Sequence, residues 1–109
     1  MIIRFRADNP LGYPDLSKGQ LYCVIGIEAD HFRLLNDAGK PYLYPSEEFD
    51  IVDSREPQDW INQFGADGAR YSYPESLNRV GFFEDFFDGK HQQVSTFWGI
   101  VNRNLAGAA

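Results

Sequence analysis

Two pairs of adjacent carboxylates come closest to an acid–base pair in this sequence. Glu47 and Glu48 form the first pair, and Glu84 and Asp85 form the second. General acid–base catalysis requires carboxyl groups in unlike surroundings, with one of them buried so that its pKa rises. Both pairs lie in polar stretches, where solvated surface charge is the expected role. We therefore predict no catalytic residue among them.

A metal site is conceivable only around the second pair. Three acids precede His91 closely: Glu84, Asp85 and Asp88. Together these side chains could hold a hard cation or a mixed-ligand metal. Gly89 interrupts the segment, however, and the acids are expected to face solvent. The favoured interpretation is therefore that the protein holds no metal.

The remaining residues give no indication of a catalytic nucleophile or a cofactor site. The nucleophile-elbow, zinc-protease, Cys-x-x-Cys and glycine-rich phosphate-binding motifs are all missing from the sequence. His31 stands at a turn entering a strand, where a surface role is expected. Cys23 is the single cysteine and lies in an apolar strand, so we expect a small buried hydrophobe. The sequence predicts a protein without a cofactor that is not an enzyme.

The charge balance points toward a protein partner. Lys and Arg total 10 against 16 Asp and Glu, which gives a formal net charge of −6. Nucleic acid and anionic membranes attract basic surfaces, so neither is an expected partner. A basic protein would be attracted, because complementary charge speeds association. The acidity could alternatively serve only solubility.

The chain is long enough for one domain, spanning residues 1–109. It has 109 residues, of which 43% are hydrophobic and 16% aromatic, enough for one packed core. The opening segment MIIRFRADNP has no apolar stretch typical of a signal peptide. No apolar run approaches the roughly 20 residues that span a bilayer. A cytoplasmic location is therefore expected.

Short β-strands dominate residues 1–53. Apolar alternation and turn residues predict five strands, at 2–6, 20–28, 31–36, 41–44 and 49–53. The second strand is apolar on both faces, which favours a central position, and Gly26 suggests a bulge within it. Gly39 suits the hairpin between the third and fourth strands. Strands this short and close should curl into a small closed or nearly closed antiparallel barrel.

Residues 54–109 should be mainly helical. Ser54 could cap a helix that ends at Gly65, with Trp60, Ile61 and Phe64 on one face. An extended piece follows at 69–73, then a two-turn helix at 82–88. The last helix is expected at 91–105. Its apolar residues fall on one arc, from which only Ile100 is excluded: Val94, Phe97, Trp98, Val101 and Leu105.

About a third of the chain, from Leu16 to Asp53, resembles small bacterial SH3-like barrel proteins. The similarity rests on three short motifs. They are Lys18, Gly19, Tyr22 and Val24; then Asp37, Gly39, Tyr42, Leu43, Tyr44 and Pro45; then Phe49, Ile51 and Val52. The resemblance implies an α+β fold, a small antiparallel SH3-like β-barrel of about five strands followed by C-terminal helices. Such small acidic proteins are also similar to the immunity-protein class, whose members block secreted bacterial toxins.

Two groups of residues are candidates for partner binding. The first combines aromatic and acidic side chains near the later strands: Tyr42, Tyr44, Glu47, Glu48 and Asp50. The second is the acidic face of the 82–88 helix: Glu84, Asp85 and Asp88. Aromatic residues beside acids suit a basic protein surface. In the alternative interpretation, the tyrosines and the four phenylalanines of 82–87 pack in the core and the acids only solubilise the protein.

The sequence therefore favours a non-enzymatic protein-binding domain. We expect an immunity or inhibitor protein that occludes the basic active site of a toxin or effector. A peptide-binding adaptor or regulatory module is the main alternative. A small enzyme with an unrecognised site, and an oligomeric component with an apolar patch around 82–87, also remain open.

Overall fold

In the part of the chain that the structure describes, seven antiparallel strands and two α-helices make up the fold. The computed structural model describes residues 1–6 and 12–108, with side chains of the last helix described through Arg103. The strands are β1 (Ile2–Phe5), β2 (Leu21–Glu28), β3 (His31–Leu35), β4 (Pro41–Pro45), β5 (Phe49–Asp53), β6 (Trp60–Phe64) and β7 (Arg70–Pro74). The helices are α1 (Phe82–Phe87) and α2 (His91–Ala108), and two 3₁₀ turns lie at Ser46–Glu48 and Glu75–Leu77.

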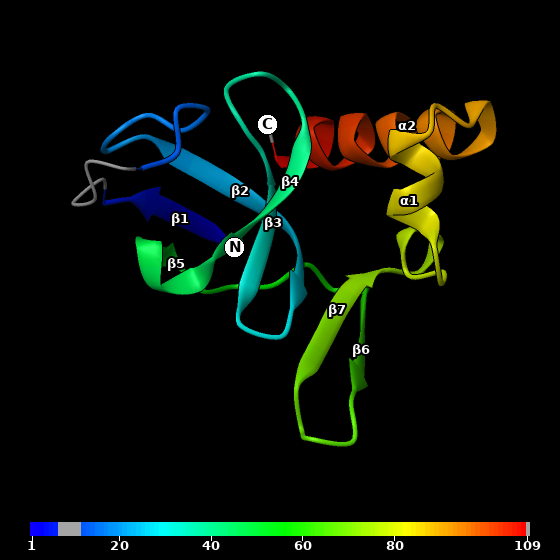
Figure 1. Cartoon of the computed structure of the whole chain (residues 1–109), viewed down its shortest axis with the longest axis horizontal. Helices are drawn as coiled ribbons and strands as arrows, with labels where there is room; N and C mark the ends of the chain where they lie inside the picture. Colours follow the sequence, from blue (N-terminus) through cyan, green and yellow to red (C-terminus); the bar gives the residue numbers. More distant parts are fainter. Residues whose placement is uncertain (7–11, 109) are drawn as a thin grey trace.

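β2 is the central strand, as its two apolar faces predicted. The main sheet order is β4-β3-β2-β1-β5, and β2 also pairs with β7, which pairs in turn with β6 (Figure 1). The N-terminal half of β2 pairs with β1, and its C-terminal half pairs with β3 and β7. The sheet has seven strands and is not closed. The expected closed or nearly closed barrel of about five strands is therefore not confirmed, although the α+β class is.

The predicted bulge at Gly26 is present. The register between β2 and β3 shifts between Val24 and Gly26. The glycine is required by packing, since a Cβ atom there would lie 2.1 Å from Cε1 of Tyr73 on β7. Gly26 thus lets β7 approach β2 closely enough to pair with it.

The side of β2 that faces the core differs in part from expectation. Tyr22 and Val24 are buried, and they belong to the first core cluster with Ile3, Leu34 and Phe49. Cys23 is exposed, so its expected burial is wrong. Cys23 lies opposite Ile2 of β1, on the outward face of that pair of strands.

The predicted helix between Ser54 and Gly65 is wrong, because residues 60–64 form strand β6. The hairpin of β6 and β7 projects from the body of the molecule (Figure 1). Trp60 is buried, whereas Phe64 is 69% exposed, so these residues share no buried helical face. The extended piece expected at 69–73 is confirmed as β7.

Both C-terminal helices are confirmed, but the buried face of α2 is not the expected one. Phe97, Ile100 and Val101 are buried, while Trp98 is 36% exposed. The expected position of Leu105 on the apolar face lies outside the described side chains. Together with Tyr73, Leu77 and Phe82, the three buried α2 residues form a second core cluster.

Candidate functional site

Tyr44 is a core residue, as the alternative interpretation of the tyrosines expected. Only 3% of it is exposed, and its ring packs against Phe49 and Tyr13. The hydroxyl donates to Asp15 Oδ2 at 2.6 Å and accepts from Asn36 Nδ2 at 3.1 Å. Burial, followed by the hydrogen bond to Asp15, raises the pKa of the Tyr44 phenol. Through this hydrogen bond, Tyr44 links the segment around Asp15 to the β3–β4 hairpin.

The acids after β4 form a group of their own. Glu47 and Asp50 are exposed and Glu48 is half-buried. Asp50 lies 3.5 Å from Arg6, which also donates to the backbone carbonyl of Glu47. These residues lie near β5, at the opposite end of the molecule from α1 (Figure 1). The structure therefore does not join them to the acids of α1.

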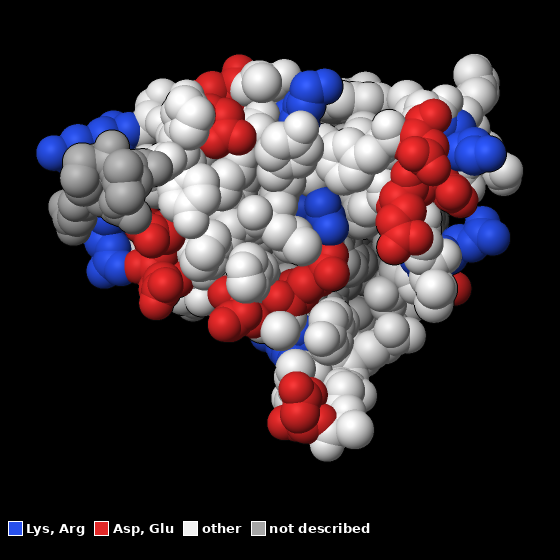
Figure 2. Space-filling view, viewed as in Figure 1, with Lys and Arg blue, Asp and Glu red and all other residues white. Residues whose placement is uncertain are grey.

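Tyr42 of β4 does contact α1, the short helix that carries predicted acids. It is 40% exposed on β4, and its ring lies 5.5 Å from that of Phe87 on α1, centroid to centroid. Glu84 is exposed on the same short helix, Asp88 is exposed at the C-cap just after it, and Asp85 is half-buried. Acidic side chains gather over α1 in the space-filling view (Figure 2). One predicted aromatic and the three predicted α1 acids thus lie together.

The four phenylalanines of α1 mostly belong to the core. Phe82 is 5% exposed, and Phe83 and Phe86 are partly buried against the second core cluster. Phe86 packs on Phe97 of α2 with ring centroids 4.8 Å apart. Only Phe87 is largely exposed, at 46%. A broad apolar dimer patch made by all four rings is therefore not present on this surface.

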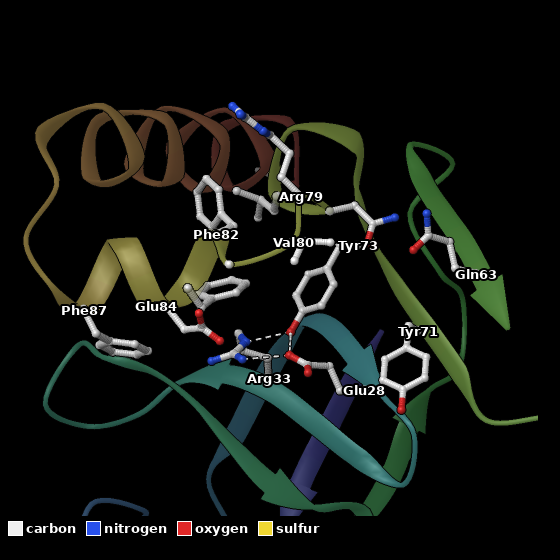
Figure 3. A pocket seen from close by; sticks show the side chains of 14 residues that line it. Glu28, Arg33, Gln63, Tyr71, Tyr73, Arg79, Val80, Phe82, Glu84 and Phe87 are labelled. Carbon is white, nitrogen blue, oxygen red and sulfur yellow. Dashed lines mark hydrogen bonds and ion pairs between the residues drawn. The ribbon is translucent and has the colours of Figure 1, made fainter. Parts of the chain in front are cut away.

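A buried charged cluster lies beside α1 and was not predicted. Arg33 of β3 is only 6% exposed and donates to Glu28 Oε2 at 2.7 Å and to the Tyr73 hydroxyl at 2.6 Å. Tyr73 donates to the same Glu28 oxygen at 2.5 Å. The Arg33 guanidinium also lies 3.7 Å from the centre of the Phe83 ring. The cluster thereby ties α1 to three strands (Figure 3).

This cluster forms the floor of a pocket of about 420 Å³ between α1 and the β6–β7 hairpin (Figure 3). Glu84 and Phe87 line it on the α1 side, and Gln63 and Tyr71 line it on the hairpin side. Arg79 also lines the pocket, but it extends away from the floor cluster toward the helices (Figure 3). The pocket therefore combines aromatic rings with carboxylates that can be approached from solvent.

The histidines lie elsewhere. His31 is half-buried at the start of β3, with Nδ1 2.8 Å from Asp30 Oδ1, and His91 is exposed at the start of α2. Neither of them lines the pocket. Within residues 1–6 and 12–108, no three His, Cys, Asp or Glu side chains are grouped so that they could hold a metal ion.

Local patterns in the sequence are not sufficient to predict the floor cluster. Glu28 and Arg33 come from adjacent strands, but Tyr73 follows Arg33 by 40 residues. Two signals were available: Arg33 lies inside an apolar strand, and Gly26 lies opposite the Tyr73 ring. Both become meaningful only once β7 is known to pair with β2.

Alkaline pH should destabilise the fold through Tyr44 and Tyr73. Burial raises the pKa of both phenols above the ordinary value of 10.0. Above that pH, the unfolded chain releases these protons while the folded protein retains them. The free energy of unfolding should therefore be unaffected by these groups below pH 10.0 and should fall above it by about 1.4 kcal/mol per pH unit for each tyrosine.

Denaturant titrations across this pH range measure that slope. Tyr44→Phe and Tyr73→Phe should each make that slope shallower, because each removes one buried phenol. If all tyrosines of the folded protein ionise near pH 10.0 by absorbance, the protected phenols do not exist and the expectation is wrong.

Comparison with known proteins adds no relative from which a role could be transferred. The chain matches no family model, no curated protein and no solved structure. In the part of the chain that the structure describes, no helix is both long and apolar enough to cross a membrane. The site must therefore be interpreted from its own residues.

Proposed function

We propose that this chain is a non-enzymatic protein-binding domain that acts in the cytoplasm and inhibits a basic partner, in the manner of a toxin-immunity protein. The observation that carries this proposal is the contact between Tyr42 and Phe87 at 5.5 Å, flanked by the acids of α1. It places two exposed aromatic rings beside Glu84 and Asp88.

Such a surface suits the entrance of a basic active site. Aromatic side chains provide large contact areas at low entropic cost, and they are enriched among residues that dominate binding energy. The surrounding carboxylates complement a basic surface and speed the encounter. The net charge of −6 acts in the same direction over longer distances.

The arrangement of the first five strands supports a relationship to SH3-like proteins. β1 lies between β2 and β5, and β2, β3 and β4 follow one another as hairpins. A 3₁₀ turn at Ser46–Glu48 connects β4 to β5. In this proposal β6, β7 and the helices are additions to a small SH3-like unit, and they supply the acidic face.

Affinity co-purification of the tagged protein from its native cells tests the proposal. We expect one stoichiometric basic partner, which the double variant Glu84→Lys/Asp85→Lys should release. The matched control is Glu47→Lys/Glu48→Lys, which reverses an acidic pair at the other end of the molecule and should retain the partner. Recovery of the chain alone, or loss of the partner only in the control, would contradict the proposed surface.

A peptide-binding module is the second candidate, and the pocket beside α1 favours it. A volume of about 420 Å³ is large enough for one or two side chains of an extended segment. Micromolar binding of short peptides, without a stoichiometric folded partner, would support this function in place of inhibition.

A further inference from the structure

We infer that the pocket between α1 and the β6–β7 hairpin binds a cationic side chain, Arg or Lys, presented by the protein partner. This inference rests on the proposed function, and it names the chemistry that the partner would insert. The pocket holds about 420 Å³, and Glu84 of α1 lines it.

The pocket already accommodates one guanidinium. Arg33 lies over the Phe83 ring at 3.7 Å, with a carboxylate and a phenol oxygen as its hydrogen-bond acceptors. Aromatic faces and carboxylates are the groups that favour a desolvated cation. The walls therefore have the chemistry that a second cation requires.

Two carboxylates remain open to a ligand. Glu84 is exposed on α1, and Figure 3 shows it pointing toward the floor of the pocket. The Glu28 side chain is 30% exposed, and both of its described donors bond to Oε2. Since a carboxylate can accept several hydrogen bonds, Glu28 can still receive one from a ligand.

Aromatic contact is available at both ends of the pocket. Tyr71 on β7 is 37% exposed, and Phe87 on α1 is 46% exposed. A Lys or Arg side chain could place its aliphatic carbons on these rings and its charged group between the carboxylates. An apolar side chain would instead desolvate Glu84 and Glu28 without providing a donor.

An anionic ligand is the competing possibility, because two arginines line the pocket. Arg33 is buried, and its Nε, Nη1 and Nη2 atoms already donate to Tyr73, Pro41 and Glu28. Arg79 extends away from the floor (Figure 3). An anion would therefore meet the carboxylates before it met a free cation, which disfavours it.

Titration of the full-length, isotope-labelled chain with blocked arginine amide tests the inference by NMR. We expect saturable shifts at Gly81, Glu84 and the Gln63 side-chain amide, with a dissociation constant of about 1 mM. Glu84→Gln and Tyr71→Ala should each weaken binding about threefold or more. The matched control Glu47→Gln, which removes the same charge outside the pocket, should leave the affinity unchanged.

Three outcomes would overturn the inference. They are no saturable shift with the arginine probe, equal weakening by Glu47→Gln, and tighter binding of blocked glutamate or inorganic phosphate at the same amides. Because the probe needs no partner, saturable binding at these amides supports the pocket even if no partner co-purifies. Conversely, a partner whose retention is unaffected by Glu84→Gln combined with Tyr71→Ala would contradict the pocket and leave the proposed inhibition intact.

Discussion

Replacing Arg33 with methionine should lower the free energy of unfolding by about 3 kcal/mol or more. Arg33 is 6% exposed and is the only member of the floor cluster that contacts β2, β4, β7 and α1 at once. Its loss would leave the Glu28 charge without its cation and the buried Pro41 carbonyl without its side-chain donor. Uncompensated charges and orphaned buried acceptors are among the most destabilising consequences of a single substitution.

Arg55→Met is the matched control. Arg55 also pairs with a carboxylate, Asp53, but its side chain is 89% exposed, so its replacement should lower the free energy of unfolding far less than Arg33→Met does. Adding Glu28→Gln to Arg33→Met should recover part of the lost stability, because it removes the unpaired charge. Urea titrations of the four proteins measure these differences. Equal losses at Arg33 and Arg55 would show that the cluster does not tie α1 to the sheet.

The β-half of the fold was predictable because its signals are local. Apolar alternation and turn residues located five strands within a residue or two of their observed bounds. Gly39 indeed has a positive φ of 73° at the β3–β4 turn. A hairpin requires only neighbouring residues to specify its register, so one sequence is sufficient to find it.

The segment after β5 was harder, because its structure depends on distant pairing. The spacing of Trp60, Ile61 and Phe64 fits one face of a helix as well as it fits a strand. β6 is a strand because β7 pairs with it, and β7 is held in place by Ile27 and Glu28 of β2. The glycines at 65 and 68, which turn this hairpin, were the signal that could have revealed it.

Half of the candidate site could be inferred in the same way. Acids on a short helix are expected to be exposed, and Glu84 and Asp88 are. Tyr42 and Tyr44 carry identical side chains two residues apart, yet only Tyr44 is drawn into the core, where Asp15 and Asn36 bond its hydroxyl. The floor cluster joins residues up to 45 positions apart, so no local pattern could predict it.

Phe97→Ala should also be severely destabilising and should lower the free energy of unfolding by about 3–5 kcal/mol. Phe97 is fully buried, and its ring packs against Phe86 in a tilted arrangement and against Phe83 edge to face, with ring centroids 4.8 and 6.0 Å away. Removing it would leave a cavity where α1 meets α2. Because α1 carries the acids of the proposed binding face, the same change should weaken partner binding before the sheet unfolds.

The variant Trp98→Ala tests which face of α2 is buried: the face seen in the structure or the face predicted from the spacing of apolar residues. On the predicted arc, Trp98 is a core residue and Ile100 is not; in the structure Trp98 is 36% exposed and Ile100 is 7% exposed. Trp98→Ala should therefore lower the free energy of unfolding by about 1 kcal/mol, well below the loss for Phe97→Ala. Ile100→Ala should lower it by about 2 kcal/mol or more. Denaturant titrations of the three variants measure and compare these losses. The reverse order at 98 and 100 would mean that α2 is rotated about its axis, and the contacts of Phe97 with α1 would then have to be reassigned.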